Sequence, residues 1–419
     1  MSAPRPLRLG LIAATFTGNR GAEAMLLATI DETRRRYPDA EIHVLTYAPA
    51  ADAAWLARRP HTGVFLHAST PLTLAFRWFP GACLARLLPF LKAPLPARSG
   101  QGILRLLDLD AVVDLAGVSF MDRREKFLPF NVLTLFPFLL HGVPVVKLSQ
   151  ALGPIRSLPN RLCARWVLPR LAHLAARGRQ TSAFLEEFGL GRQNWSYAPD
   201  TAFCLRLETE VPATFAERED VLLMPSSLMA ASHPDYPDLL LATLRRLRAL
   251  GLRVHLLAHS WKEGTDRPRN NDFPLCRSLH AALGSPADMT LFGPGLDARA
   301  LKAVVGRHRL AVTSRFHGMI AALDTATPVL VLGWSHKYRE VLAEFDCESC
   351  ALKTDGLDAA QLADTIAAAH AGAAESSARL ALRLPEVRRQ SAAQFDRLFS
   401  LLAVRRASAG AAVSSVSDS

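Results

Sequence analysis

The sequence LAVTSRFHGMIAALDTATPVLVLGWSHK, residues 310–337, decides how the chain is expected to fold. Apolar runs near its two ends predict two β-strands, and the stretch between them has the pattern of a short helix. Ser314, Arg315 and His317 follow the first strand, and Lys337 follows the second. Because ligands of open parallel sheets bind at the carboxyl ends of the strands, this unit predicts a site for an anionic ligand and a proton-transfer step.

The same alternation of apolar strands and helical stretches runs through most of the chain. Further strands are expected at residues 7–15, 41–47, 63–67, 108–120, 143–148, 195–198, 221–224, 253–258, 289–292 and 349–352. A helix is expected over Pro159–Ala175. Continuous apolar runs are typical of strands buried on both faces of a parallel sheet, so the pattern predicts an α/β protein.

The charged stretch Glu208–Asp220 has no clear period and is expected to separate two domains. We predict an N-terminal Rossmann-like domain over 1–207 and a C-terminal one over 221–374, facing each other across an interdomain cleft. A C-terminal helix over 375–404 is expected to return to the first domain. The small and polar residues 405–419 are predicted to form a disordered tail.

Composition narrows the function classes. The chain has 419 residues, half of them hydrophobic, so it can bury a large core. Its net charge of +11 comes almost entirely from Arg and fits an anionic substrate, an acidic membrane surface or Arg-rich codon usage. Because these Arg residues are spread along the chain without a recognised binding module, no nucleic-acid partner is expected.

The cysteines indicate a reducing compartment and predict no metal site. Six scattered Cys suggest reduced thiols and a cytoplasmic location. The C-x-x-C at Cys347–Cys350 lacks the second pair that a zinc site needs, so no metal site is predicted.

The stretch Thr70–Arg98 differs from its surroundings, because it is apolar and basic and is broken by several Pro residues. Two interpretations are open: a peripheral element at the inner face of the membrane, and an ordinary insertion that packs over the sheet. The sequence has no run of 18 or more apolar residues that would predict a membrane span.

Six segments together resemble the polysaccharide pyruvyl transferase family. They are GNRGAEAML (18–26), DAVVDLAGVSFMD (110–122), SQALGPI (149–155), RGRQTSAFLEEFGL (177–190), APDTAF (198–203) and TSRFHGMIAALDTATPVLVLGWSHK (313–337). Their order and spacing extend the resemblance over roughly residues 7–350. The chain departs from the family pattern at Ala22, where Asp is common, and at Ala116, which replaces a Gly.

This resemblance implies a two-domain fold like that of the GT-B glycosyltransferases. It also implies an enzyme that moves a pyruvate unit from phosphoenolpyruvate onto a sugar of a surface polysaccharide or its lipid-linked precursor, forming a ketal. Members commonly need no dissociable redox cofactor, so none is expected. Two other hypotheses stay open: a GT-B glycosyltransferase that uses a nucleotide sugar, and a non-catalytic family member that binds glycan.

Ketal formation from phosphoenolpyruvate suggests roles for the residues of the opening stretch. Arg315 is the candidate for holding the carboxylate and phosphate through its planar fork of donors, with a structural ion pair as the alternative. His317 is the candidate for moving a proton near neutral pH. Ser314 and Lys337 are expected to bind the donor, and Lys337 would stabilise the departing phosphate.

Four candidates lie in the predicted first domain. Asn19 and Gly21 are expected to bind acceptor or donor where a loop leads into a helix. Gln150 is expected to face the cleft. Asp200 either serves as an acid or base or caps the crossover between the domains.

Overall fold

The computed structural model describes residues 5–87, 103–209, 211–212, 214–261, 271–333, 336–353 and 356–417. The chain divides into two compact units. The first unit comprises Met1–Phe16, Met25–Thr201 and Gln390–Ser419, and the second comprises Thr17–Ala24 and Ala202–Arg389.

A parallel sheet with the strand order β3-β2-β1-β4-β6-β7-β8 forms the centre of the first unit, and β5 pairs with the end of β6. Its strands are β1 (Arg8–Ile12), β2 (Glu41–Thr46), β3 (Val64–Ala68), β4 (Ala111–Asp114), β5 (Val118–Ser119), β6 (Val145–Leu152), β7 (His173–Ala176) and β8 (Trp195–Tyr197). All residues of β4, β6 and β7 are buried, as expected for strands covered on both faces.

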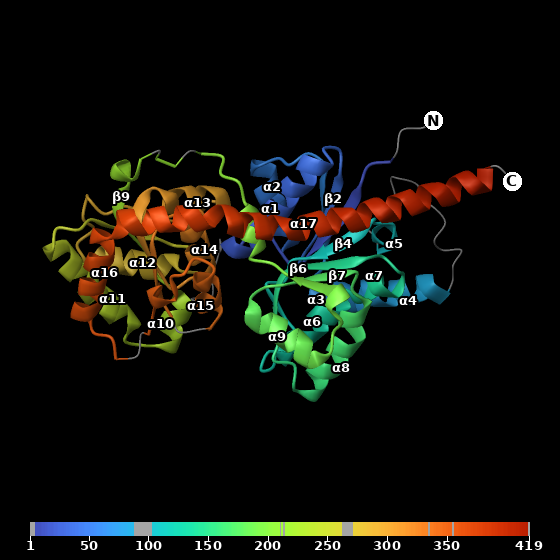
Figure 1. Ribbon diagram of the computed structural model, residues 1–419, viewed down its shortest axis with the longest axis horizontal. Coiled ribbons are helices and arrows are strands. Elements are labelled where there is room, and N and C mark those ends of the chain that lie inside the picture. Colours follow the sequence, from blue (N-terminus) through green and yellow to red (C-terminus); the bar gives the residue numbers. More distant parts are fainter. Residues whose placement is uncertain are drawn as a thin grey trace. The chain divides into compact units, whose positions relative to one another are not determined.

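Helices cover both faces of this sheet, with α1 and α2 on one face and α6 to α9 on the other (Figure 1). The helices and helical turns up to β8 are α1 (Arg20–Arg36), α2 (Pro49–Arg58), α3 (Pro71–Thr73), the π-helical turn η1 (Leu74–Trp78), α4 (Phe79–Leu87), α5 (Ile103–Leu106), η3 (Glu125–Phe127), α6 (Leu128–Leu133), α7 (Phe136–Leu140), α8 (Leu158–Val167), η4 (Leu168–Arg170), α9 (Arg179–Phe188) and η5 (Arg192–Asn194).

The second unit is built on a parallel sheet with the order β11-β10-β9-β12-β13-β14. Its strands are β9 (Glu219–Met224), β10 (Val254–Leu257), β11 (Leu291–Phe292), β12 (His308–Thr313), β13 (Val329–Leu332) and β14 (Ala351–Leu352). Residues from β9, β10, β12 and β13 form its apolar core together with α11, α12 and α16.

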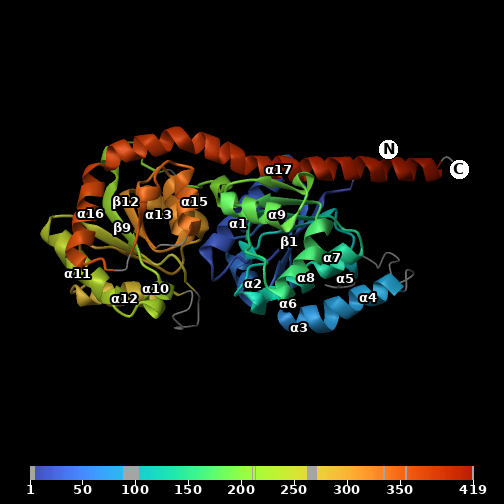
Figure 2. The same ribbon diagram turned by 60° about the horizontal axis from the view of Figure 1, so that its bottom comes forward.

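In this unit α11, α12 and α16 lie on one face of the sheet and α13 and α15 on the other (Figure 2). The helices and turns are η6 (Thr201–Cys204), η7 (Phe215–Glu217), α10 (Ser227–Ser232), α11 (Tyr236–Ala249), α12 (Phe273–Ala282), α13 (Ala298–Gly306), α14 (Phe316–Asp324), α15 (His336–Ala343), η8 (Glu348–Cys350), α16 (Ala359–Ala371) and α17 (Ala373–Ser417). The α/β class and the two Rossmann-like domains predicted from the sequence are confirmed.

The last helix, α17, begins in the second unit and ends in the first. Its Phe399 packs against Tyr37, the residue after α1, with ring centroids 5.7 Å apart. The buried side chain of Gln394 accepts a hydrogen bond from Ser149 Oγ at 3.0 Å. The last part of the chain therefore completes the first unit.

The observed boundaries differ from the predicted ones at several points. Residues 17–24 belong to the second unit and not to the N-terminal domain predicted over 1–207. The helix predicted over 375–404 is longer, since α17 extends to Ser417 and includes most of the predicted tail 405–419. The helix predicted over Pro159–Ala175 is wrong at its end, because His173–Ala176 form the buried strand β7. The Ala-rich sequence of β7 favours a helix locally, and only its pairing with β6 and β8 makes it a strand.

None of the helices in the described part of the chain combines the length and hydropathy needed to cross a membrane.

The buried His173 should make the first unit less stable in acid. Burial, together with the charge of Arg397, lowers the pKa of His173 to about 4. An unfolded His binds its proton near pH 6.5, so the stability is complete above that pH and is lost as the pH falls from 6.5 towards 4. In His173→Gln, the loss in free energy of unfolding between pH 7 and pH 5, measured by urea titration, should be smaller by roughly 1–2 kcal/mol.

His233→Gln, at a partly exposed position, is the control for the loss of any imidazole from the protein. An unchanged pH dependence in His173→Gln would contradict the assignment.

Candidate functional site

Three neighbouring strands of the second unit end at the same edge of its sheet. The order β10-β9-β12 is parallel throughout. The chain runs from β9 to β10 and β11 on one side and then crosses back to β12 on the other side of β9. This is a topological switch point, where ligands of doubly wound sheets bind. The polar residues that follow the three strands are Ser226, Ser227, His259, Ser260, Ser314, Arg315 and His317.

One buried carboxylate joins the three strand ends. Asp272 precedes α12 and has no exposed side-chain surface. Its oxygens accept hydrogen bonds from the backbone N–H of Ser227 at 2.8 Å and of Ser260 at 2.9 Å. They also accept bonds from Nε of Arg315 at 2.8 Å and from its Nη2. All four donors come from the segments that directly follow β9, β10 and β12, so Asp272 fixes these segments relative to one another.

Arg315 is therefore part of a buried ion pair with Asp272, the structural alternative to a ligand-binding role. Its Nη2 also donates to Ser227 Oγ at 3.2 Å. Within the described residues, Nη1 is the guanidinium nitrogen that makes no hydrogen bond. The side chain is 11% exposed, so contact between Nη1 and a ligand stays a prediction.

Ser314 is held on both sides by tyrosines. Its hydroxyl lies 2.7 Å from the hydroxyl of Tyr236, and its carbonyl accepts a bond from Tyr338 at 3.1 Å. Burial raises the pKa of both tyrosines, which therefore stay protonated at neutral pH. Because the Ser314 hydroxyl is hydrogen-bonded inside the unit, its direct observed role is to anchor the loop that carries Arg315.

The N-terminal motif and the opening stretch meet at His317. Asn19 caps α1, since its Oδ1 accepts a hydrogen bond from the backbone N–H of Gly21 at 3.0 Å. A methyl group built on Gly21 would overlap the His317 ring, so only glycine permits this approach. Gly21 and His317 are the second residues of α1 and α14, so the N-termini of two helices meet at this contact.

A small pocket of about 20 Å³ lies beside this contact. Its polar lining residues are Arg20, His259, Lys302, His317 and Asp324. All its lining residues belong to the second unit. Burial and the charges of Arg315, His317 and Arg20 hold the pKa of His259 well below its usual range, so this imidazole is neutral at pH 7.

The charged groups of the pocket are mostly paired. Arg20 Nη1 donates to the buried Glu23 at 2.6 Å. Lys302 pairs with Asp324 and donates to the Leu205 carbonyl at 2.5 Å. Burial raises the pKa of Asp324, whereas the charges of Lys302 and Arg388 oppose this shift. The cations that an anionic ligand would meet in the pocket therefore already have counterions. The backbone N–H groups at the helix N-termini are a further source of positive charge.

The remaining predicted residues fall into two places. Lys337 lies in the first turn of α15, after β13 of the same sheet. Gln150 and Asp200 belong to the first unit and are buried. Gln150 accepts a bond from Ser119 Oγ at 2.7 Å and donates to the Asp114 carbonyl at 3.2 Å. Asp200 forms an ion pair with Arg177.

Sequence reasoning missed several residues of this site. His259 directly follows the strand predicted over 253–258, so the strand-end rule used for Arg315 would have found it. Arg20 lies between the two matched residues Asn19 and Gly21. For Asp272 no local signal exists, because its partners lie 12 to 45 residues away along the chain.

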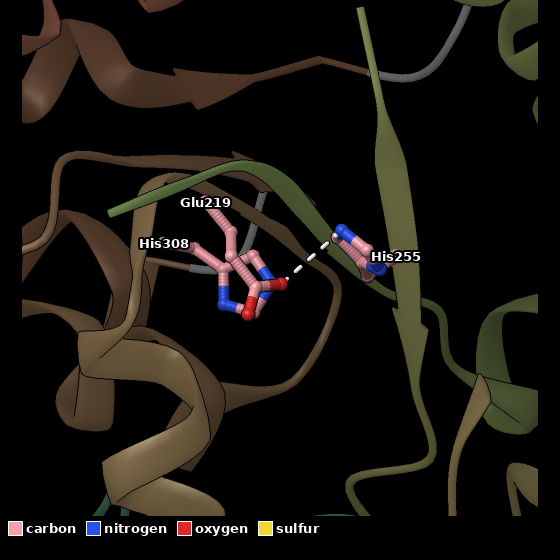
Figure 3. A group of neighbouring side chains, drawn as sticks. All are labelled: Glu219, His255 and His308. Atoms are coloured by element: carbon pink, nitrogen blue, oxygen red, sulfur yellow. Dashed lines mark ion pairs between the residues drawn. The ribbon is translucent and has the colours of Figure 1, made fainter. Parts of the chain in front are cut away.

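A second polar cluster lies at the amino end of the same sheet, where Glu219, His255 and His308 meet (Figure 3). Nε2 of each His lies 3.2–3.3 Å from Glu219 Oε2, a spacing that could suit a metal ion. However, Nδ1 of His255 accepts the Thr290 N–H at 3.0 Å, so the neutral ring carries its proton on Nε2 and donates it to Glu219. Because this proton occupies the lone-pair position that a metal ligand needs, we interpret His255 and Glu219 as a hydrogen-bonded pair.

Comparison with known proteins gives a family and a fold. The model of the family described as Polysaccharide pyruvyl transferase matches residues 19–336, most of the chain. Solved structures share the GT-B fold at low sequence identity. A UDP-GlcNAc 2-epimerase from Neisseria meningitidis bound to UDP-GlcNAc is 11% identical, with 94% of this chain and 100% of that chain covered and a TM-score of 0.61.

Two further structures show the same fold. Arabidopsis thaliana UGT89C1 complexed with quercetin is 11% identical, with 96% of this chain and 100% of that chain covered and a TM-score of 0.56. A Methanocaldococcus jannaschii UDP-GlcNAc 2-epimerase is 12% identical, with 91% and 100% covered and a TM-score of 0.53. The GT-B-like fold predicted from the resemblance is confirmed.

Removal of the Asp272 charge should destabilise the second unit. Asp272→Asn leaves the Arg315 guanidinium buried without its counterion, which typically costs about 3–5 kcal/mol. The free energy of unfolding, measured by urea titration followed by tryptophan fluorescence, should fall by this amount. The control is Asp288→Asn, which removes the exposed partner of Arg248 and should change stability little. Equal effects of the two substitutions would show that the buried pair is not what holds the loops.

Proposed function

Because the chain belongs to the polysaccharide pyruvyl transferase family, we propose that it moves a pyruvate unit from phosphoenolpyruvate onto a sugar. The acceptor is a sugar of a surface polysaccharide or of its lipid-linked precursor, and the product is a ketal. The reaction takes place in the cytoplasm, in keeping with six free cysteine thiols. The proposal requires no dissociable redox cofactor.

The proposed reaction adds two sugar hydroxyls to the enol carbon of phosphoenolpyruvate. The methylene carbon gains one proton and becomes a methyl group. The enol carbon forms two C–O bonds to the sugar, and its C–O bond to phosphate breaks. Of the two protons lost by the hydroxyls, one balances the proton gained by the methylene carbon, and the other leaves with phosphate.

The contact between Gly21 and His317 is the observation that carries this proposal. It brings two helix N-termini together beside a pocket, and backbone N–H groups at such ends bind phosphate and carboxylate groups. Arg20 lines the pocket, and the charge of Arg315 acts on the pocket residue His259, so we propose that both support the charged groups of the donor.

His317 is the proposed proton carrier. It lines the pocket from the first turn of α14, close to the neutral His259. An imidazole here can protonate the methylene carbon or accept a proton from a sugar hydroxyl at neutral pH. Ser314 and Lys337 support this side, Ser314 through the loop that it anchors and Lys337 as a cation for the departing phosphate.

The acceptor side is proposed to lie in the first unit. Gln150 and Asp200 are both hydrogen-bonded or paired inside the unit, so they are proposed to act through the loops that they position. Asn19 and Gly21 group with the second unit and are proposed to serve the donor.

A phosphate-release assay tests the proposal. Purified protein is mixed with phosphoenolpyruvate and candidate glycan acceptors, and phosphate release is followed. Turnover of a nucleotide sugar in place of phosphoenolpyruvate would favour the glycosyltransferase alternative, since the epimerase from Neisseria meningitidis was solved with UDP-GlcNAc on the same fold. If neither donor turns over, the non-catalytic glycan-binding alternative takes precedence.

Substitutions at the contact should strongly slow turnover and leave the fold intact. His317→Ala should lower the rate of phosphate release by about a hundredfold or more, because the proton carrier is lost. Gly21→Ala should cause a comparable loss by displacing the His317 ring. The matched control is Gly372→Ala, where an added methyl meets only the Ala368 carbonyl at 3.8 Å. Circular dichroism should be unchanged in all three, and an active His317→Ala variant would refute the role assigned to His317.

A further inference from the structure

We propose that the exposed face of residues 71–87, together with α8, docks the protein on an anionic lipid bilayer. The proposed docking follows from the side chains of this surface and does not depend on the transferase reaction. Residues 88–98 of the apolar and basic stretch Thr70–Arg98 lie outside the described residues, so the docking surface is defined from residues 71–87 only.

The helical run Pro71–Leu87 is apolar on two sides. One side, which includes Leu74 and Trp78, is buried in the core of the first unit. The other carries Leu72, Phe76 and Leu87, which are 72%, 76% and 77% exposed. A surface helix that buries only one face would carry polar residues on the other, so the second face is fitted to an apolar environment.

An aromatic chain extends this surface to α8. Phe79 lies 4.8 Å from Phe136 of α7, measured between ring centroids, and Phe136 lies 5.5 Å from Trp166 of α8. Figure 2 shows α3 and α4 beside α6, α7 and α8. On α8, Leu158 and Leu162 precede Trp166 at intervals of four residues and are 69% and 60% exposed. The ring contacts thus link the helical run of residues 71–87 to α8 through Phe136 of α7.

The charged residues within the two stretches that form this surface are all basic. Arg77 and Arg86 are exposed on the first run, and Arg161, Arg165 and Arg170 are exposed on α8 and η4. The guanidinium of Arg170 lies 5.3 Å from the Trp166 ring. Residues 71–87 and 158–170 contain no Asp or Glu. Apolar side chains flanked by Arg fit the boundary between anionic headgroups and acyl chains.

This charge pattern decides between a bilayer and a second copy of the chain. Two copies joined through this surface would bring ten Arg side chains together, five from each, without a carboxylate from either stretch. An anionic membrane supplies the missing negative charge and also an apolar layer for Leu72, Phe76 and Leu87. A consequence, which rests on the proposed function, is that a lipid-linked acceptor would be presented to the enzyme at the membrane surface.

Vesicle sedimentation of the full-length protein tests the docking. We expect the protein to sediment with vesicles that contain phosphatidylglycerol, and binding to weaken as salt is added. Vesicles of phosphatidylcholine alone should bind much less protein. The double substitution Phe76→Ser and Leu87→Ser should weaken binding by at least about tenfold, because two exposed apolar side chains are removed.

Matched controls separate docking from general hydrophobicity. Leu382 and Val404 on α17 are 81% and 68% exposed, and the double substitution Leu382→Ser and Val404→Ser should leave vesicle binding unchanged. Arg77→Gln with Arg86→Gln should weaken binding and reduce its dependence on salt. All variants should keep native circular dichroism and the native rate with a soluble acceptor. A failure of the transferase assay would therefore leave the docking result intact.

Three outcomes would overturn the proposal. The first is equal sedimentation with neutral and anionic vesicles, and the second is native binding by the Phe76→Ser, Leu87→Ser variant. The third is absence of vesicle binding combined with a concentration-dependent dimer that this variant abolishes, which would assign the surface to a second copy of the chain.

Discussion

The buried carboxylate of Asp272 holds three strand ends of the second unit together. Asp272 accepts bonds from the loops after three neighbouring strands, and these bonds offset the cost of its desolvation. The loop that carries Arg315 and His317 is thus fixed before any ligand arrives. Such pre-organisation is what a site needs when it must hold groups in place during a reaction.

Paired charges also limit which ligands the pocket can hold. Arg20, Lys302 and Arg315 each have a buried carboxylate partner in the second unit. A cluster of unpaired cations would hold any polyanion, whereas these groups keep the local charge near balance. Attraction for an anion then comes largely from backbone N–H groups at the helix starts, whose directions are fixed. The arrangement favours ligands of the correct shape over ligands that are merely charged.

Much of the architecture could be predicted from the sequence, because buried parallel strands appear as continuous apolar runs. The same runs located the strand ends, and hence Ser314, Arg315 and His317. The features that could not be predicted are those decided by contacts between residues far apart in the sequence. The strand β7 has an Ala-rich sequence that favours a helix, and its neighbours in the sheet decide otherwise. Local periodicity also could not show that Thr17–Ala24 group with the second unit, or that Asp272 would be the partner of Arg315.

The position of α17 in the chain has a consequence for biosynthesis. The strands of the first unit are all translated by Tyr197, yet Phe395 and Phe399, which are buried in it, are translated almost two hundred residues later. Until then the nascent first unit must keep the apolar surface around Tyr37 exposed, and Ser149 lacks its bond to Gln394. The N-terminal half therefore cannot complete its folding on the ribosome before the second half has emerged, which lengthens the time during which chaperones or aggregation compete for it.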